Sequence, residues 1–338
     1  FDRNLRNTLG FSPNGVDYID IDSYDPSTYS LDLFSPDELL NNGSSLVYYY
    51  GYDIYGNKPS STPTLQSFFE EGSDRSIAAF NPIYTAGYIQ DKFAVEDLIF
   101  NVGLRIDRYD ANQKVLKDQH LLYSAYTAGA NTNLLNTTAI PSTIGNDYVV
   151  YVDDIDNPSS IVGYRNNDDD SWYNSDGLQI SDPTILAEAA GGKIAPYLID
   201  AASAKQGIVN VDQAFEDYNP EVIFMPRIAF SFPISDEAQF FAHYDVLTQR
   251  PPEGNRIEPV DYLFMSDRVG ATLNNPNLKP EKTVDYELGF AKTLSLKSAL
   301  KISAFYKELR DMIQITNVLS AYPAQYYTYD NIDFGTVK

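Results

Sequence analysis

Hydrophobic and polar residues alternate along six stretches of the chain, with the two-residue period of a β-strand that has one apolar face. The six stretches cover residues 84–95, 98–109, 222–234, 239–249, 283–294 and 299–309. They form three pairs, and a turn of only two to four residues separates the members of each pair. The sequence therefore predicts three antiparallel hairpins, and a seventh strand is expected from Tyr326 onward.

The two faces of these strands differ in chemistry. Apolar residues on one face are Leu98, Phe100, Val102, Leu104, Ile106, Ile228, Phe230, Phe232, Phe240, Ala242, Tyr244, Val246, Val284, Tyr286, Leu288 and Phe290. The opposite face carries Arg105, Asp107, Arg227, His243, Asp245, Asp285, Glu287 and Lys301. Burying so many charges in a soluble core would have a high desolvation cost. We interpret these eight residues as facing the wet lumen of a pore, where cross-strand ion pairing along the wall is the simplest role for them.

Strand length and loop length both favour a membrane-spanning barrel. Tilted strands of about 9 to 11 residues cross a bilayer, whereas soluble strands typically have about 5 or 6 residues. Long connections, 110–221 and 250–282, follow the first two hairpins. Short turns at one end and long loops at the other are typical of outer-membrane barrels. We therefore predict an all-β fold, namely an antiparallel transmembrane β-barrel segment with long extracellular loops.

An antiparallel β-sandwich is the alternative that the pattern leaves open. In a sandwich, the apolar face is buried against a second sheet and the charged face meets solvent. Such a protein would be a secreted or surface-exposed adhesin or binding module, with calcium as a candidate ligand. The two interpretations differ in what covers residues such as Phe230 and Phe290, which is lipid in a barrel and protein in a sandwich.

The hairpins divide the chain into six segments. They are an extracellular loop region with room for strands (1–82), a barrel hairpin (83–110), a large acidic extracellular loop with a short helix (111–221), a barrel hairpin (222–249), an extracellular loop (250–282), and a barrel hairpin with the following strand (283–338). No plug domain is recognisable in the chain. We expect it to be an internal piece of a longer protein, because Phe1 is not an initiator Met and the final strand stops without a turn.

Composition narrows the function. The formal net charge is −23, from 24 basic and 47 acidic residues, so nucleic acid is not an expected partner, since binding a polyanion needs a basic surface. The chain has no cysteine, which excludes disulfides and thiolate metal sites. It has no G-x-S-x-G, H-E-x-x-H or phosphate-loop motif, and we predict no enzymatic activity.

Four stretches resemble a known family. The stretch "NPNLKPEKTVDYELGF" (275–290) is similar to the part of TonB-dependent outer-membrane receptors in which a loop with N-x-x-L-K-P-E precedes a strand with Y-E-L-G. Residues 86–110, "AGYIQDKFAVEDLIFNVGLRIDRYD", and 226–244, "PRIAFSFPISDEAQFFAHY", resemble two further blocks of that family. The stretch "YYYGYDIYGNK" (48–58) resembles the Oar-like receptors of Bacteroidetes, which also carry a carboxypeptidase-regulatory-like domain.

The resemblance implies a 22-stranded barrel in the bacterial outer membrane, closed by an N-terminal plug, that imports a ligand with energy passed through TonB. Its implied partners are outer-membrane lipid, TonB through an N-terminal part of the longer protein, and a surface lipoprotein as a further candidate. The turns near residues 96, 235 and 295 would face the periplasm. The ligand itself stays open between a siderophore, a glycan and a peptide.

Two groups of loop residues are candidates for binding. Aromatic side chains combine apolar area with a polar tip, so contact with a ligand and packing within the loops are both open for Tyr48, Tyr49, Tyr50, Trp172 and Tyr173. The connection 110–221 has 17 acidic and 5 basic residues, and carboxylates cluster at Asp153, Asp154, Asp156, Asp168, Asp169 and Asp170. Such oxygen atoms suit calcium, although a solvated acidic loop is the competing interpretation. No other cofactor is expected.

Overall fold

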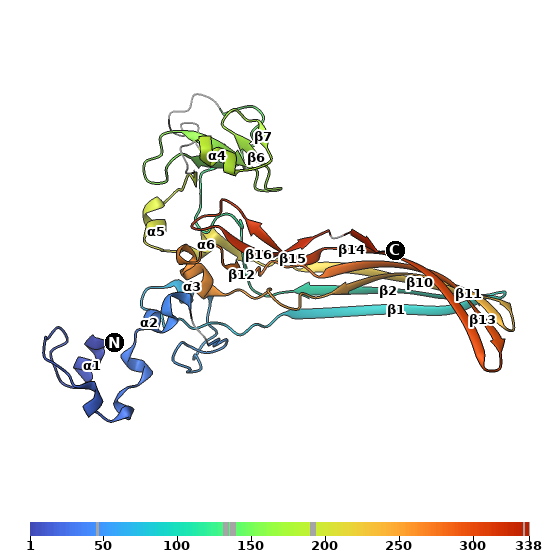
Figure 1. Ribbon diagram of the computed structural model, residues 1–338, viewed down its shortest axis with the longest axis horizontal. Coiled ribbons are helices and arrows are strands. Elements are labelled where there is room, and N and C mark those ends of the chain that lie inside the picture. Colours follow the sequence, from blue (N-terminus) through green and yellow to red (C-terminus); the bar gives the residue numbers. More distant parts are fainter. Residues whose placement is uncertain (45–46, 131–134, 136–139, 190–193, 334, 338) are drawn as a thin grey trace.

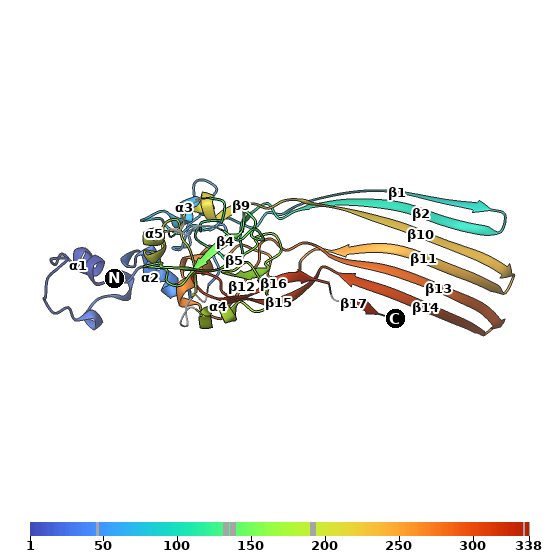
Figure 2. The same ribbon diagram turned by 90° about the horizontal axis from the view of Figure 1, so that it is seen from above.

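A seven-stranded antiparallel sheet forms one end of the molecule (Figure 1 and Figure 2). The computed structural model describes residues 1–44, 47–130, 135, 140–189, 194–333 and 335–337. The order of the strands in the sheet is β1-β2-β10-β11-β13-β14-β17. These strands are β1 (Ile83–Val95), β2 (Leu98–Asp110), β10 (Glu221–Ser235), β11 (Ala238–Gln249), β13 (Glu281–Ser295), β14 (Ser298–Arg310) and β17 (Gly335–Val337). The first six strands thus lie side by side in chain order, as three hairpins.

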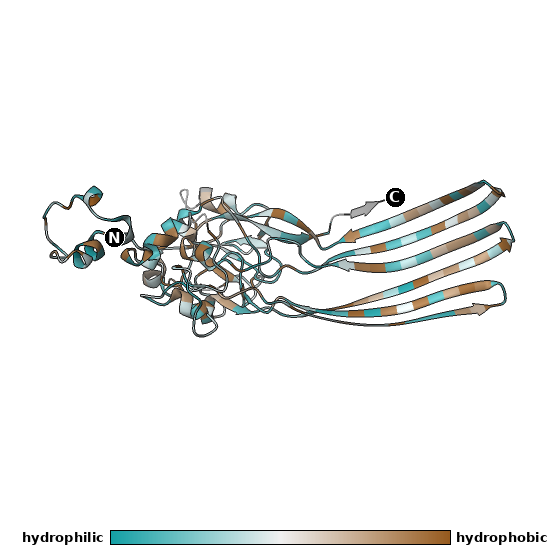
Figure 3. Cartoon of the chain, turned by 90° about the horizontal axis from the view of Figure 1, so that it is seen from below, coloured by the Kyte–Doolittle hydropathy of each residue, from teal (hydrophilic) through white to brown (hydrophobic). Residues whose placement is uncertain are grey.

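Strand pairing places the predicted apolar residues on one face of the sheet. Phe230 is paired with both Phe100 and Ala242, and directly paired residues project to the same side. Along each strand, hydrophobic and hydrophilic positions alternate (Figure 3). The apolar side chains are uncovered, since Leu288 is 53% and Ile302 is 60% exposed. No second sheet covers this face among the described residues, which favours the barrel over the β-sandwich alternative.

The three short turns lie at one end of the sheet, and the long connections lie at the other end (Figure 2). The short turns are Glu96-Asp97, Asp236-Glu237 and Leu296-Lys297. Glu96 has a left-handed backbone conformation, with φ of 53°, as tight two-residue hairpin turns require. None of the helices in the described ranges is long and apolar enough to cross a membrane.

The long connections fold together into a second part of the molecule, the outer body, made of the described residues within 36–82, 111–220, 250–280 and 311–333. Its strands are β3 (Lys114–Leu116), β4 (Val149–Val152), β5 (Ile161–Arg165), β6 (Trp172–Asn174), β7 (Gln179–Ile180), β8 (Ala195–Pro196), β9 (Phe215–Asp217), β12 (Thr272–Leu273), β15 (Met312–Val318) and β16 (Tyr326–Ile332). Its helices are α2 (Pro36–Leu40), η4 (Asn41–Gly43), α3 (Leu65–Phe69), α4 (Thr184–Ala189), α5 (Ala201–Lys205), α6 (Val211–Ala214), α7 (Pro259–Leu263) and η6 (Met265–Asp267).

An N-terminal arm, residues 1–34, extends away from the outer body (Figure 1). It contains α1 (Asp2–Thr8), η1 (Ile21–Ser23), η2 (Pro26–Thr28) and η3 (Leu31–Leu33). The loop region expected over residues 1–82 therefore consists of short helices and turns, and its described residues include no strand.

The main hydrophobic core lies in the outer body, not against the sheet. One buried cluster joins residues from four distant parts of the chain, among them Leu122, Phe215, Tyr262 and Tyr326. By contrast, β1 is exposed along its entire length. Apolar burial is what holds irregular segments in place, so the long loops support one another while the sheet keeps a free apolar face.

The strand expected from Tyr326 does form, but it does not join the seven-stranded sheet there. β16 pairs with β15 in a separate three-stranded sheet, and the chain returns to the large sheet only at β17, beside β14. Tyr326 is only 4% exposed, and its hydroxyl donates a hydrogen bond to the Gln119 carbonyl (2.6 Å). Packing in the outer body therefore holds β16 away from the wall.

The short helix expected over 182–190 is α4. The Asp182 carboxylate accepts hydrogen bonds from the backbone N–H and the hydroxyl of Thr184, which supports the cap predicted at this residue. The expected end at 191–192 lies outside the described residues.

Candidate functional site

The charged residues of the sheet gather on the face opposite the apolar one. Asp245 and Asp285 are directly paired across β11 and β13, and cations flank them on the outer strands. The Arg227 guanidinium lies 3.0 Å from Asp245, and the Lys307 ammonium lies 2.9 Å from Asp285. Like charges directly opposite each other destabilise a sheet, and the cations at the two ends of this row of four give each carboxylate a cation beside it.

Other predicted lumen residues extend this pattern. Arg105 donates a hydrogen bond to Asp107 (2.7 Å), and the Tyr84 hydroxyl donates to the same carboxylate. His243 lies 3.8 Å from Asp245 and 3.7 Å from Glu287, measured from Nε2 to the nearest carboxylate oxygen. The ammonium of Lys301 lies over the Phe241 ring, 4.7 Å from the ring centroid. The structure thus brings the eight residues to one face, mostly as ion pairs.

Two carboxylates on this face are nearly buried. Asp245 and Asp285 are 7% and 9% exposed, and one oxygen of each, Oδ1, is buried without a hydrogen bond among the described residues, although the Arg227 Nε lies 3.0 Å from Asp245 Oδ1 in the ion pair. A carboxylate accepts several hydrogen bonds when it is satisfied. The centre of the charged face is therefore an acceptor-rich strip.

The first acidic cluster is occupied by contacts within its own loop. The Asp153 carboxylate accepts hydrogen bonds from the backbone N–H groups of Ser159 (2.9 Å) and Ser160 (3.1 Å). Asp154 accepts from the backbone N–H of Asp156 (2.8 Å). The Asp156 side chain in turn forms an ion pair with Lys205 (2.7 Å).

The second acidic cluster also has local partners. The backbone N–H of Asp168 donates a hydrogen bond to the side-chain oxygen of Asn166. The Asp169 carboxylate accepts a hydrogen bond from the backbone N–H of Ser171. Asp170 lies 2.7 Å from the fully buried Arg165. Within the described residues, no group of three or more His, Asp or Glu side chains is arranged to hold a metal ion. A calcium site therefore stays a prediction from the sequence alone.

Arg165 is a central residue of the outer body that the sequence did not reveal. It also forms an ion pair with Asp118, and its Nε lies 3.4 Å from the Tyr151 hydroxyl. His120 packs nearby, edge-on to Trp172, and burial together with the positive charge of Arg165 lowers the pKa of His120 to about 4. The histidine is therefore neutral at physiological pH, and this cluster has a structural role.

Trp172 belongs to the same core. It is only 6% exposed, and its ring centroid is 4.6 Å from that of Tyr151. Tyr173 is half-buried and packs against Tyr148 (5.3 Å). These placements favour the packing interpretation for Trp172, whose ring is buried, whereas Tyr173 packs on a neighbouring ring and keeps part of its side chain accessible.

Tyr48, Tyr49 and Tyr50 line a cavity of the outer body, and Tyr50 also lines a second, larger one. Tyr48 is 78% exposed and stacks parallel to Tyr50, with 5.9 Å between ring centroids. The guanidinium of Arg256 lies over the Tyr50 ring, 4.4 Å from its centroid, and the Tyr50 hydroxyl donates to Glu258. The Tyr49 hydroxyl oxygen is buried without a partner among the described residues.

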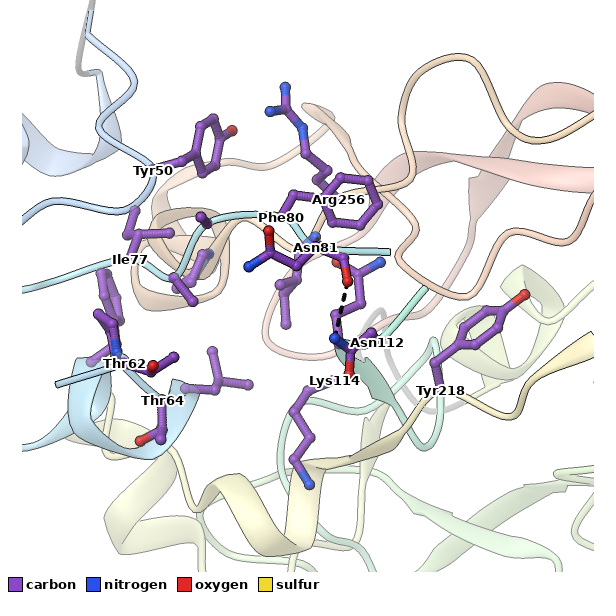
Figure 4. Close-up of a pocket in the computed structure, with 18 of the residues that line it drawn as sticks. Tyr50, Thr62, Thr64, Ile77, Phe80, Asn81, Asn112, Lys114, Tyr218 and Arg256 are labelled. Carbon is purple, nitrogen blue, oxygen red and sulfur yellow. Dashed lines mark hydrogen bonds between the residues drawn. The ribbon is translucent and has the colours of Figure 1, made fainter. Parts of the chain in front are cut away.

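A cavity of about 480 Å³ opens beside Tyr50 (Figure 4). Segments that surround it come from residues 62–68, 76–81, 110–114 and 256–259. Its size is within the range of ligand sites, roughly 300 to 1,000 Å³. A smaller cavity of about 200 Å³ lies on the side of Tyr49 and Glu258. Because distant segments build both cavities, no local motif marked Arg256, Glu258, Ile77 or Phe80 as site residues.

Glu258 makes this site sensitive to pH. Burial raises the pKa of its carboxyl to about 7, with Asp261 adding to the rise and the Tyr50 hydroxyl, Arg256 and Arg268 opposing it. The ordinary pKa of a glutamate carboxyl is 4.5. Between this pH and about 7, Glu258 therefore keeps its proton when it is buried and loses it when it is exposed to water. Packing against Glu258 is therefore strongest at low pH and weakens as pH rises toward 7.

We expect the segment 47–58 to be held more tightly at pH 5.5 than at pH 8. Amide hydrogen exchange of this segment, corrected for the intrinsic pH dependence of exchange, is the measurement. Glu258→Gln keeps the shape and removes the titration, so its protection is expected to be the same at both values. Equal pH dependence in the two proteins would contradict this role of Glu258.

Comparisons with known proteins bear on the family of this sheet. The family model "TonB dependent receptor-like, beta-barrel" matches residues 1–338. A solved structure with a similar fold is a double mutant of the hemophore receptor HasR of Serratia marcescens, in complex with its hemophore HasA and heme (14% identity, TM-score 0.38, 75% of this chain and 30% of that chain).

Two further solved structures are similar. They are the FrpB iron transporter of Neisseria meningitidis, F3-3 variant (12% identity, TM-score 0.31, 82% of this chain and 26% of that chain), and the ferric-catecholate import receptor Fiu of E. coli K12 (12% identity, TM-score 0.31, 74% and 23%). The chain spans less than a third of the length of these three structures. Comparison with curated proteins gave no match. Since the family model covers the whole chain, the chain belongs to the TonB dependent receptor-like β-barrel family.

Proposed function

We propose that this chain forms part of the wall and the outer mouth of a transport barrel in the outer membrane of a Gram-negative bacterium. The two-faced sheet carries the proposal. Its uncovered apolar face, with Phe224 at 58% and Ile302 at 60% exposure, suits contact with lipid chains, and its charged face suits a polar lumen. Six strands of 12 to 15 residues are long enough to cross the bilayer when tilted.

In the proposed arrangement, the charged face lines a pore. A plug domain, which belongs to another part of the longer protein, blocks this pore. The exposed cation of Arg227, whose side chain is 63% accessible, supports this, because it can donate hydrogen bonds to a polar plug. TonB then supplies the energy for import. A barrel of 22 strands, the Oar-like subtype and a surface lipoprotein partner belong to the same proposal.

The outer body is the proposed ligand-capturing surface. The cavity beside Tyr50 supports this role, because it combines apolar walls with the cationic Arg256. The names of the similar solved structures refer to heme, iron and ferric catecholate. For this chain we propose import of a scarce ligand, without naming the ligand.

Labelling of single cysteines on intact cells tests the proposed orientation. The full-length receptor is used after any cysteine outside this chain has been replaced, and the chain itself has no native cysteine. Val16 and Leu296 are 98% and 105% exposed and lie at opposite ends of the molecule, so a failure to react reports the side of the membrane and not burial. An impermeant maleimide is expected to label Val16→Cys on intact cells, and Leu296→Cys only after the outer membrane is permeabilised.

The matched control is the same pair of variants in permeabilised cells, where both should react. Labelling of both positions on intact cells, or recovery of the receptor in the soluble fraction, would contradict the membrane-spanning arrangement.

A further inference from the structure

The segment Ala78–Asn81 lines the large cavity with backbone groups that lack partners. Just before it, the Ile77 N–H donates to the Tyr52 carbonyl (3.2 Å) and the Ile77 carbonyl accepts from Gly51 (2.7 Å). Just after it, pairing of β1 begins at Ile83. Between these points, the Asn81 carbonyl accepts from the Asn112 side chain (3.0 Å), and no other backbone hydrogen bond forms among the described residues.

This gap in pairing leaves the backbone N–H and C=O groups of the segment to water, since groups that are not paired within the protein are normally satisfied by solvent. Ala78, Ala79 and Asn81 are exposed, and the cavity lies directly against them (Figure 4). A ligand that carries a main chain of its own satisfies such a row of donors and acceptors, as in recognition by strand addition. The segment therefore offers an edge for an extended peptide.

Charge on the cavity wall selects the kind of peptide. Lys114 is already paired with Asp217 (3.0 Å). Arg256 is exposed and stacked on Tyr50, and it forms no ion pair within 4.0 Å among the described residues, although its charge acts on the Glu258 carboxyl. A guanidinium held flat by an aromatic ring presents its edge for two-point binding of a carboxylate. In a chain with a net charge of −23, this unpaired cation is a specific feature.

The rest of the wall is apolar. Phe68 and Ile77 are buried beneath the cavity, and Phe80 and Leu65 are half-buried at its sides. An aliphatic or aromatic side chain placed here would leave water, which favours binding. The apolar surface lies between the unpaired backbone and Tyr50 (Figure 4).

Side-chain hydrogen-bonding groups at this site are largely in use, which disfavours a sugar as the ligand. Gln113 donates to the Asn255 carbonyl (2.6 Å) and accepts from the Ile257 N–H (3.0 Å). Asn112 donates to Asn81. Sugar hydroxyls need several such free side chains, whereas a peptide uses the free backbone.

We propose that the cavity binds an extended peptide whose main chain pairs with residues 78–81, whose apolar side chain packs on Ile77 and Phe80, and whose carboxylate pairs with Arg256. The proposal deepens the capture role of the outer body and rests on it only for its biological meaning. Binding itself is measured on the purified receptor in detergent, so failure of peptide binding and failure of the membrane orientation are distinguishable.

The test uses the full-length receptor and a positional library of fluorescent tetrapeptides read by anisotropy. The library is expected to select an apolar residue together with a free carboxylate, at the C-terminus or as Asp or Glu. For the selected peptide, amidation or exchange of the acidic residue for its amide is expected to weaken binding at least about tenfold, as is methylation of its backbone nitrogens.

Variants of the receptor connect these effects to the cavity. Arg256→Gln should weaken the acidic peptide about tenfold and leave the amidated peptide unchanged, because both changes remove one interaction. Lys114→Gln is the matched control on the same wall, and its effect should be under about threefold, because that lysine is already paired with Asp217. Binding of no peptide at millimolar concentration, selection of oligosaccharides instead, or indifference to backbone methylation would overturn the proposal.

Discussion

Arg165→Ala is expected to open the outer body while the sheet stays folded. The side chain is fully buried and pairs with Asp118 and Asp170. Its removal leaves the Asp118 carboxylate, which is 13% exposed, without its cation. Breaking a buried ion pair in this way costs about 3 to 5 kcal/mol. Amide hydrogen exchange in β4 and β5 should therefore rise by on the order of 10² to 10³-fold, while exchange in β13 and β14 stays the same.

Lys205→Ala supplies the control for this experiment. Lys205 pairs with Asp156 at 2.7 Å, and the two side chains are 57% and 45% exposed. Exposed pairs contribute roughly 0 to 1 kcal/mol, so the exchange of β4 and β5 should change little. Similar exchange in the two variants would show that the Arg165 cluster does not hold the outer body together.

Leu288→Arg is expected to impair insertion of the receptor into lipid vesicles, and Ser303→Arg is expected to have little effect. Leu288 lies on the apolar face, where its directly paired neighbours are Ala242 and Ala304. Neither neighbour offers a carboxylate that could pair with an introduced arginine. Arginine near the middle of the bilayer on the lipid face of a barrel costs about 2 to 4 kcal/mol. Ser303 lies at the neighbouring level of β14 on the charged face, beside Gly289.

The fraction of receptor that folds into vesicles is the readout, followed by the mobility difference between heated and unheated samples. A strong defect only in Leu288→Arg would assign lipid to the apolar face. Equal behaviour of the two arginine variants would mean that lipid does not cover Leu288, and the proposed position of the membrane would have to be abandoned.

The sheet could be predicted from the sequence because its determinants are local. Alternation from Val284 to Phe290 fixes which side chains share a face, and the hairpin turns fix the register. Strand pairing confirms these faces, with Tyr244 beside Tyr286 and Phe240 beside Phe290. The identity of the family was equally local, since it rested on short stretches such as 275–290.

The outer body could not be predicted in the same way, because its determinants are distant in the chain. Arg165 is far from Asp118 in sequence, and Tyr50 is far from Arg256 and Glu258. A single sequence contains no periodic signal for such contacts. For the same reason the exposure of Trp172 could not be decided in advance, since burial by Tyr151 and His120 depends on how the loop folds.

The core that joins Leu122 to Tyr326 also sets an order of assembly. Its members are carried by connections that follow different hairpins, so the core can close only after the chain as far as Tyr326 has been delivered to the same side of the membrane. Until then, the earlier loops have exposed apolar side chains and no partners for them. Resistance of the 111–220 segment to an external protease would thus report completed biogenesis of the wall, and a stalled intermediate would be cut there first.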